Sequence, residues 1–178
     1  ENLPPELKAE NPLVRQSDQY LEWANGSNVS VGTSYRGDTP ADLHVSEYGK
    51  TSVDKPDAAK EILTGAIQAV PLTGRIWVES TAHGTAGEFH GMVKRAEALK
   101  LEGRPLTARD FKFHFFGWWI KPEYRLPSNL VVVPSDMKAY FAEIEAKIGR
   151  KIDADQRAWY VKTREELGPD KIKEEFPS

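Results

Sequence analysis

The sequence predicts an α/β protein with a mainly parallel sheet, flanking helices and a small C-terminal helical subdomain. Three short apolar segments, at 43–46, 75–80 and 111–115, have the length and composition of strands. Two segments with helical periodicity, at 57–70 and 88–101, lie between them. The resulting strand–helix–strand–helix–strand order forms two crossover units, which are typical of a parallel sheet covered by helices.

Length and composition narrow the class of protein. A chain of 178 residues suits one domain that buries about two thirds of its unfolded surface. The chain has no cysteine, which excludes disulfides and thiolate metal or redox sites. No apolar run approaches the roughly 18 residues that a membrane span needs, so we expect no membrane partner. The formal net charge is −3, so any contact with nucleic acid requires a local basic patch.

The N-terminal segment is rich in turn residues. Residues 1–12 hold three prolines among charged residues and predict an irregular lead-in. Residues 13–23 alternate weakly and fit either a strand or a short helix. A turn sequence at 25–28, followed by period-two alternation at 29–34, predicts a hairpin.

The central helices follow from the spacing of their apolar residues. Between the first two strands, four such residues recur at four-residue spacing on one predicted face: Ala58, Ile62, Ala66 and Val70. Gly74 breaks the chain before the strand at 75–80. A glycine-punctuated loop at 81–87 then leads into the helix at 88–101.

After Pro134 the pattern becomes helical. Ser135 and Asp136 predict the start of a helix that runs to about Ile148 and ends at Gly149. A second helix begins at Asp153 or Asp155 and ends before the Gly168-Pro169 pair, with Trp159 placed to pack back. We therefore expect an α/β part at 1–134 and a helical subdomain at 135–178. Trp118 and Trp119 are expected to pack this subdomain against the sheet.

Polar side chains end two of the predicted strands. Ser46 and Glu47 follow the strand at 43–46, and Ser80 and Thr81 close the strand that contains Glu79. Functional groups of open α/β sheets gather at the carboxyl ends of the strands. A carboxylate there can accept a proton from an attacking water, and a neighbouring hydroxyl can contact a phosphate. Two ordinary strand ends that meet solvent remain the alternative.

Several stretches from residue 25 to the last residue follow one another in a characteristic order. They are Asn25-Gly26-Ser27, Val31-Gly32-Thr33-Ser34-Tyr35-Arg36-Gly37, Leu43-His44-Val45-Ser46-Glu47-Tyr48-Gly49-Lys50, Glu61-Ile62-Leu63-Thr64-Gly65-Ala66, Glu79-Ser80-Thr81-Ala82-His83-Gly84, Phe115-Phe116-Gly117-Trp118-Trp119-Ile120-Lys121-Pro122-Glu123-Tyr124-Arg125, Gln156-Arg157-Ala158-Trp159-Tyr160 and Glu174-Glu175-Phe176-Pro177-Ser178. In this order they resemble the large terminase subunit of tailed bacteriophages and prophages.

The resemblance implies the rear part of a P-loop-type ATPase domain in a DNA-packaging motor. On this mapping Glu47 is the catalytic carboxylate of a strand similar to Walker B, with Ser46 beside it. Ser80 and Thr81 resemble the motif that couples ATP hydrolysis to subdomain movement. Arg36 is a candidate for phosphate or DNA contact, or an arginine that braces its loop.

The same resemblance implies the ligands, partners and location of the whole protein. The cofactors would be ATP and Mg²⁺. The partners would be double-stranded DNA, the portal protein, the small terminase subunit and further copies of the chain in a ring on the procapsid. The location would be the cytoplasm of the bacterial host.

Two departures from the family pattern limit what this chain is expected to do alone. Many relatives have Asp at the position of Ser46, where it helps to hold Mg²⁺, and a hydroxyl brings no charge there. The phosphate-binding sequence G-x-x-x-x-G-K-[ST] is absent. We therefore expect a fragment, with the phosphate-binding loop upstream of Glu1, the nuclease carboxylates downstream of Ser178 and no turnover by the fragment itself.

Other functions can be weighed on the same sequence. A non-catalytic module that docks the portal, the small subunit or DNA is the main alternative. A zinc site from His44, Glu47, His83 and His90 is disfavoured, because His44 and Glu47 lie three apart on a predicted strand and point to opposite faces. The aromatic residues at 111–119 suit base stacking or, more simply, a buried core. The basic residues of the helix at 88–101 and just beyond it suit either DNA or solvent: Lys94, Arg95, Lys100 and Arg104.

Overall fold

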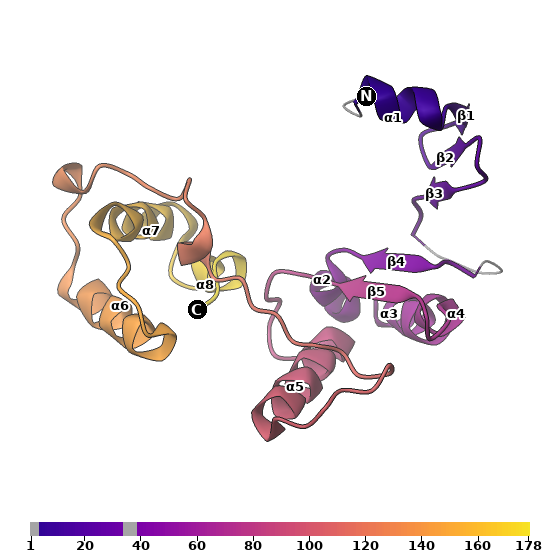
Figure 1. Cartoon of the computed structure of the whole chain (residues 1–178). Helices are drawn as coiled ribbons and strands as arrows, with labels where there is room; N and C mark the ends of the chain where they lie inside the picture. The colour runs from indigo at the N-terminus through magenta and orange to yellow at the C-terminus, as the bar shows by residue number, and fades with distance from the viewer. Residues whose placement is uncertain (1–3, 34–38) are drawn as a thin grey trace.

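The computed structural model describes residues 4–33 and 39–178 (Figure 1). The fold is mixed α/β, with a small parallel sheet of two strands and several helices. Three parts follow one another along the chain in Figure 1: a small antiparallel sheet, a central α/β unit and a group of C-terminal helices. The hydrophobic cores of the central unit and of the C-terminal helices are separate clusters of buried residues.

The N-terminal part is a meander of three short strands. Strands β1 (Leu13–Gln16), β2 (Tyr20–Trp23) and β3 (Asn28–Ser30) are antiparallel and lie in that order. The turn at 24–27 is closed by the amide of Trp23, which donates to the carbonyl of Ser27 at 2.9 Å. The hairpin predicted around this turn is therefore confirmed, and residues 13–23 form strands rather than a helix.

The expectation of an irregular lead-in at 1–12 is wrong for part of that segment. Residues Pro5–Glu10 form helix α1. Proline is tolerated at the first position of a helix, because its missing N–H would have no partner there and its fixed φ suits the helix. The prolines of the lead-in therefore begin a helix at Pro5 instead of preventing one.

The central unit contains one parallel strand pair. Strands β4 (Asp42–Val45) and β5 (Arg75–Val78) pair in register, with Leu43 opposite Ile76 and Val45 opposite Val78. The segment between them forms α2 (Tyr48–Asp54), α3 (Pro56–Glu61), the π-helical turn η1 (Ile62–Ala66) and α4 (Ile67–Ala69). Helix α5 (Gly87–Glu102) follows β5. The helices expected at 57–70 and 88–101 are thus confirmed, whereas α2 is an element that the sequence pattern did not indicate.

The parallel pair has one buried and one exposed face. Leu43 and Val45 are buried in a core cluster that also contains Ala59, Ile67 and Met92. Because side chains alternate along a strand, the residues between them point the other way. That face carries Arg75 Nε at 2.7 Å from Asp42 Oδ1, and His44 Nε2 at 3.4 Å from Glu79 Oε1.

The third strand expected at 111–115 is wrong, so the sheet has two parallel strands instead of three. Residues 111–115 contact the rest of the central unit through their side chains. Phe111 packs against the core of the central unit, and the ammonium of Lys100 lies 5.7 Å from the ring centre of Phe113. Alternating apolar residues thus do not form a strand here, because no neighbouring strand of the described chain supplies a hydrogen-bonded ladder.

The C-terminal part consists of helices α6 (Ser135–Ile148), α7 (Ala154–Leu167) and α8 (Lys171–Glu175). The short 3₁₀ turns η2 (Trp118–Ile120) and η3 (Ser128–Leu130) precede them. Gly149 ends α6 in the left-handed conformation, and the Asp153 carboxylate caps α7 by accepting from the amide of Gln156. Both predicted boundaries are confirmed.

Aromatic residues form the core of these helices. The rings of Trp118 and Tyr160 are 4.5 Å apart, and Trp118 also meets Phe141 at 6.1 Å. Tyr124 stacks on Trp159 with ring centres 4.2 Å apart, so Trp159 packs back as expected. The expectation that Trp118 and Trp119 join the helices to the sheet is wrong, because both residues belong to the C-terminal cluster itself. The boundary at residue 134 stays a prediction.

Within residues 4–33 and 39–178, no helix combines the length and the apolar character that a membrane crossing requires.

Candidate functional site

The two parallel strands end at the same edge, and the segments that leave them remain in contact. The amide of Glu79 donates to the carbonyl of Val45 at 3.0 Å, which extends the β4–β5 ladder by one residue. One step further, the amide of Tyr48 donates to the carbonyl of Glu79 at 3.2 Å. The structure therefore brings together the two strand ends that carry the polar residues singled out in the sequence.

Glu47 has an unusual backbone conformation at this edge. Its φ of 52° is positive, and it is the one non-glycine residue of the described chain with a positive φ. A left-handed conformation costs a residue with a side chain about 1–2 kcal/mol. Glu47 directly precedes α2, but its carboxylate makes no capping hydrogen bond to the helix. The side chain is exposed, as is that of Ser46, so both remain accessible to a ligand or to water.

The backbone that follows Glu47 is firmly anchored. Tyr48 is fully buried, and its hydroxyl donates to the carbonyl of Ala59 at 2.8 Å. Burial raises the pKa of the Tyr48 phenol, and the nearby charge of Glu88 raises it further, so the group stays a neutral donor. The carbonyl of Glu47 accepts from both the amide and the hydroxyl of Thr51, each at 3.2 Å. The strained residue is therefore held in place by its neighbours.

Ser80 supplies a buried hydroxyl without a partner. Its Oγ is inaccessible to solvent and makes no hydrogen bond to any described residue. A Cβ at Gly49 would lie 2.7 Å from this Oγ and 3.1 Å from the carbonyl oxygen of Thr81, so a larger residue there would require the Ser80 side chain or the loop to shift. An unpaired buried hydroxyl costs about 1–3 kcal/mol, and such groups are rare in folded proteins. The Ser80 hydroxyl thus keeps an unused hydrogen-bonding capacity inside the contact between this strand end and the helix that contains Gly49.

The other residues weighed in the sequence are distributed as follows. Arg36 lies outside the described residues. His44 pairs with Glu79 on the exposed sheet face, and His83 Nε2 lies 3.5 Å from Asp54 Oδ1 at the end of α2. Among the described residues, no three His, Asp or Glu side chains gather as a metal site would require.

The aromatic and basic segments have mixed surroundings. Phe115 and Phe116 are exposed, by 43% and 77%, whereas Trp118 and Trp119 are buried. On the basic helix face Lys94 pairs with Glu97. Arg104 lies near two carboxylates, Glu102 and Asp110, so the local positive charge is partly compensated. A role of either segment in nucleic-acid binding stays a prediction.

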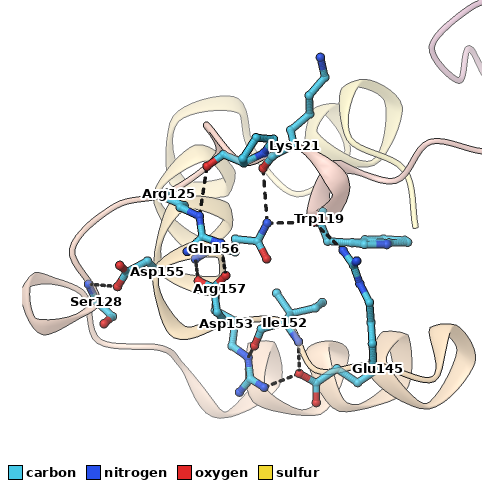
Figure 2. Close-up of polar contacts among 12 residues, drawn as sticks. Trp119, Lys121, Arg125, Ser128, Glu145, Ile152, Asp153, Asp155, Gln156 and Arg157 are labelled. Atoms are coloured by element: carbon cyan, nitrogen blue, oxygen red, sulfur yellow. Dashed lines mark hydrogen bonds and ion pairs between the residues drawn. The ribbon is translucent and has the colours of Figure 1, made fainter.

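Figure 2 shows a polar network between α6, the start of α7 and the turn η2, which sequence reasoning missed. The buried carboxylate of Glu145 accepts from the amide of Ile152 at 2.7 Å and from Arg157 at 2.5 Å (Figure 2). Lys151 Nζ donates to the same carboxylate at 3.0 Å. Burial would raise the pKa of Glu145, but these three donors outweigh it and lower the pKa to about 2. The sequence does contain a sign of this buried carboxylate. Glu145 lies at helical spacing from Met137 and Phe141, on the face of α6 that is otherwise apolar.

The same network holds the segment before α6 in place. The carbonyl of Trp119 accepts from Arg150 at 2.7 Å and from the side-chain amide of Gln156 at 2.9 Å. Arg125 pairs with the capping carboxylate Asp153 at 2.7 Å. A pocket of about 360 Å³ beside Glu145 and Arg150 opens widely to solvent. All these charged groups have protein partners, so we assign the network to structure rather than to ligand binding.

The edge formed by β4 and β5 therefore offers an exposed carboxylate, an unpartnered hydroxyl and a neighbouring threonine on adjacent strand ends. A carboxylate can orient a water and accept its proton, and a hydroxyl can donate to an anionic oxygen. Comparison of the chain with protein-family models, with curated proteins and with solved structures found no match.

Proposed function

We propose that this chain is part of the ATPase domain of a large terminase subunit, in which ATP hydrolysis drives double-stranded DNA into a viral capsid. One observation carries the proposal. Glu47 and Ser80 follow neighbouring parallel strands, and the amide after Glu47 is bonded to the carbonyl before Ser80. The proposal assigns these two neighbouring strand ends to the catalytic strand and to the coupling motif of the sequence resemblance.

Each residue has a definite part in the proposed reaction. The Glu47 carboxylate orients the attacking water and takes its proton. The strained backbone of Glu47 supports this assignment, because conformations of this kind gather at functional sites. The Ser80 hydroxyl is buried without a protein partner, so it would donate to a phosphate oxygen only after a side-chain rotation or loop movement exposes it, and Thr81 follows it in the same loop.

The described residues fit only part of an ATP–Mg²⁺ site. Glu47 and Ser80 suit the water and the phosphate, but no group of three metal-ligating side chains gathers in the described part of the chain. A phosphate-binding glycine loop is absent from the sequence. Bound ATP would supply the phosphoanhydride bond that is cleaved. Its phosphates and the metal would be held mainly by residues outside this chain, with the Ser46 hydroxyl as a neutral neighbour.

The partners proposed for the whole protein are double-stranded DNA, the portal protein, the small terminase subunit and further copies in a ring on the procapsid. The proposed location is the cytoplasm of the bacterial host.

The test uses the complete reading frame and compares the wild type with Glu47→Gln. We expect DNA-stimulated ATP hydrolysis to fall by about 10²–10⁴-fold, the range for loss of a general base, while ATP binding stays nearly unchanged. Glu143→Gln is the matched control, because Glu143 is an exposed carboxylate on α6 that pairs with Lys147. Unchanged turnover in Glu47→Gln would remove Glu47 from the mechanism and leave the proposal without its central residue.

Exposed apolar side chains favour a second candidate, a non-catalytic module that docks the portal, the small subunit or DNA. Between the central unit and α6, Phe116, Leu130 and Val132 are exposed by 77%, 77% and 89%. Large exposed apolar groups are common at binding surfaces. On this hypothesis Glu47→Gln changes stability rather than turnover, and replacing the three apolar residues by serine weakens capture of the portal or the small subunit.

A further inference from the structure

A loop follows β5 and lies along the whole length of α2; residues 79–86 are called here the post-β5 loop. At its start the carbonyl of Glu79 accepts from the amide of Tyr48, the first residue of α2. Directly after the loop, Gly87, the first residue of α5, approaches the middle of the helix, where a Cβ on Gly87 would meet Ser52 Oγ at 2.6 Å. Helix and loop are therefore in close contact at both ends of the loop.

Two glycines make this approach possible. Gly49, which lies within α2, faces Ser80 of the loop. Gly87 has a φ of +84° in addition to its close contact with Ser52. A side chain at either position would push the loop away from the helix. The loop that carries Ser80 and Thr81 thus rests on the helix that begins directly after Glu47.

A side-chain contact between an imidazole and a carboxylate joins the two elements. His83 Nε2 in the loop lies 3.5 Å from Oδ1 of Asp54, the last residue of α2. The second oxygen of Asp54 accepts from Lys50 Nζ at 2.5 Å within the helix. Both members of the pair are only partly exposed, His83 by 28% and Asp54 by 39%. Lys50 and His83 together lower the pKa of Asp54, with the hydrogen bond from Lys50 as the larger cause. Asp54 therefore stays a carboxylate that faces the loop.

We propose that Asp54 and His83 are positioning residues, whose contact holds the post-β5 loop against α2 and so fixes Ser80 and Thr81 relative to Glu47. This inference rests on the proposed function of the same edge. Neither residue touches the reacting atoms. The loop is joined to the start of α2 by the backbone hydrogen bond between Tyr48 and Glu79. The contact between Asp54 and His83 joins it to the end of α2. A loop released at Asp54 would still carry Ser80, but in a less defined place.

The test measures ATP turnover by the complete reading frame with Asp54→Ala, His83→Ala and the double variant. We expect each single change to lower kcat by roughly three- to tenfold with KM for ATP within twofold. The double variant should be little worse than either single one, because both remove the same contact. His83→Gln, which keeps a side-chain N–H donor, should recover most of the turnover. A structural role alone would change stability without separating kcat from KM.

His44→Ala is the matched control, since His44 Nε2 lies 3.4 Å from the carboxylate of Glu79, the first residue of the loop, but belongs to β4 instead of α2. It should leave kcat unchanged. Hydrogen exchange of the amides at 80–86, measured without nucleotide, should rise in Asp54→Ala and His83→Ala and stay unchanged in His44→Ala. This arm tests the contact independently of catalysis.

Different results would contradict the proposed ATPase site and the positioning role of Asp54 and His83. Turnover that survives Glu47→Gln contradicts the proposed ATPase site itself. Turnover that depends on Glu47 but is unaffected by Asp54→Ala and His83→Ala contradicts the positioning role alone. Additive losses in the double variant, or exchange at 80–86 that does not change, would also overturn it.

Discussion

The edge of the central sheet and the network around Glu145 in the C-terminal helices differ in how fully their polar groups are satisfied. In the C-terminal part the buried carboxylate of Glu145 has three donors, and the carbonyl of Trp119 has two. At the edge of the central sheet Ser80 Oγ is buried without a partner, and Glu47 holds a strained conformation. Unpaired Trp118 Nε1 is the exception in the helical part. Proteins depart from local rules mainly at functional sites, so the contrast supports a scaffold role for the helices and a ligand-binding role for the edge.

The largest expected effect comes from the aromatic core of the scaffold. Phe141 is fully buried among Trp118, Tyr140 and Tyr160. Phe141→Ala should lower the free energy of unfolding by about 3–5 kcal/mol, because it removes a buried ring and leaves a cavity. Urea unfolding followed by tryptophan fluorescence measures the change. Phe116→Ala, at a ring that is 77% exposed, should cost less than about 0.5 kcal/mol. Equal losses for the two variants would contradict the assignment of this core.

The ends of the C-terminal helices could be predicted because their causes are local. Gly149 and Asp153 each act on the nearest turn, so the sequence alone indicates where α6 ends and α7 begins. The network around Glu145 could not be predicted, since its donors lie six to twelve residues away and meet the carboxylate only after both helices have packed. The packing of Trp118 could not be predicted for the same reason, because its ring partners Phe141 and Tyr160 lie far along the chain on α6 and α7.

The central unit shows where periodicity is informative and where it is not. Apolar spacing predicted both parallel strands and the helix at 57–70, but the alternation at 111–115 predicts an extended backbone without saying whether another strand is adjacent. Helix α2 was missed because glycine, threonine and valine within Tyr48–Asp54 favour helix weakly, and packing against the post-β5 loop decides its structure. Ser46, Glu47, Ser80 and Thr81 were found from strand ends alone. The contact between Asp54 and His83 could not be found without α2, and Arg36 lies outside the described residues.

A smaller effect, with a defined pH dependence, is expected at Glu145. Glu145→Gln should lower the free energy of unfolding at pH 7 by about 2 kcal/mol, less than the 3–5 kcal/mol of a fully buried pair because Lys151 is largely exposed. The pKa of Glu145 falls from 4.5 in the unfolded chain to about 2 in the folded one. The stability gained from its charge is therefore complete above pH 4.5 and is lost as the pH falls toward 2.

Urea unfolding of the wild type and of Glu145→Gln between pH 7 and pH 2 measures this dependence. The difference in unfolding free energy should be constant at neutral pH and should shrink below about pH 4.5. Other carboxylates titrate in both proteins and cancel in the difference. A difference that stays constant down to pH 2 would show that Glu145 contributes through its shape and not through its charge.

The smallest expected effect is the one whose sign is most informative. It compares Ser52, which lies within α2, with Ser80 of the loop that packs against α2. Ser52 Oγ is buried and donates to the carbonyl of Gly49 at 2.8 Å, whereas Ser80 Oγ is buried without a partner. Ser52→Ala should destabilise the protein by about 1 kcal/mol, because it removes a satisfied hydrogen bond. Ser80→Ala should stabilise it by up to about 1 kcal/mol, because it removes an unpaired buried hydroxyl. Thermal unfolding of the two variants gives both signs directly. If Ser80→Ala also destabilises the protein, the hydroxyl has a structural partner such as a buried water. A role in binding phosphate would then not be needed to explain it. If it stabilises while slowing ATP turnover by the complete protein, Ser80 is retained at the expense of stability, as expected of a group that acts on a ligand.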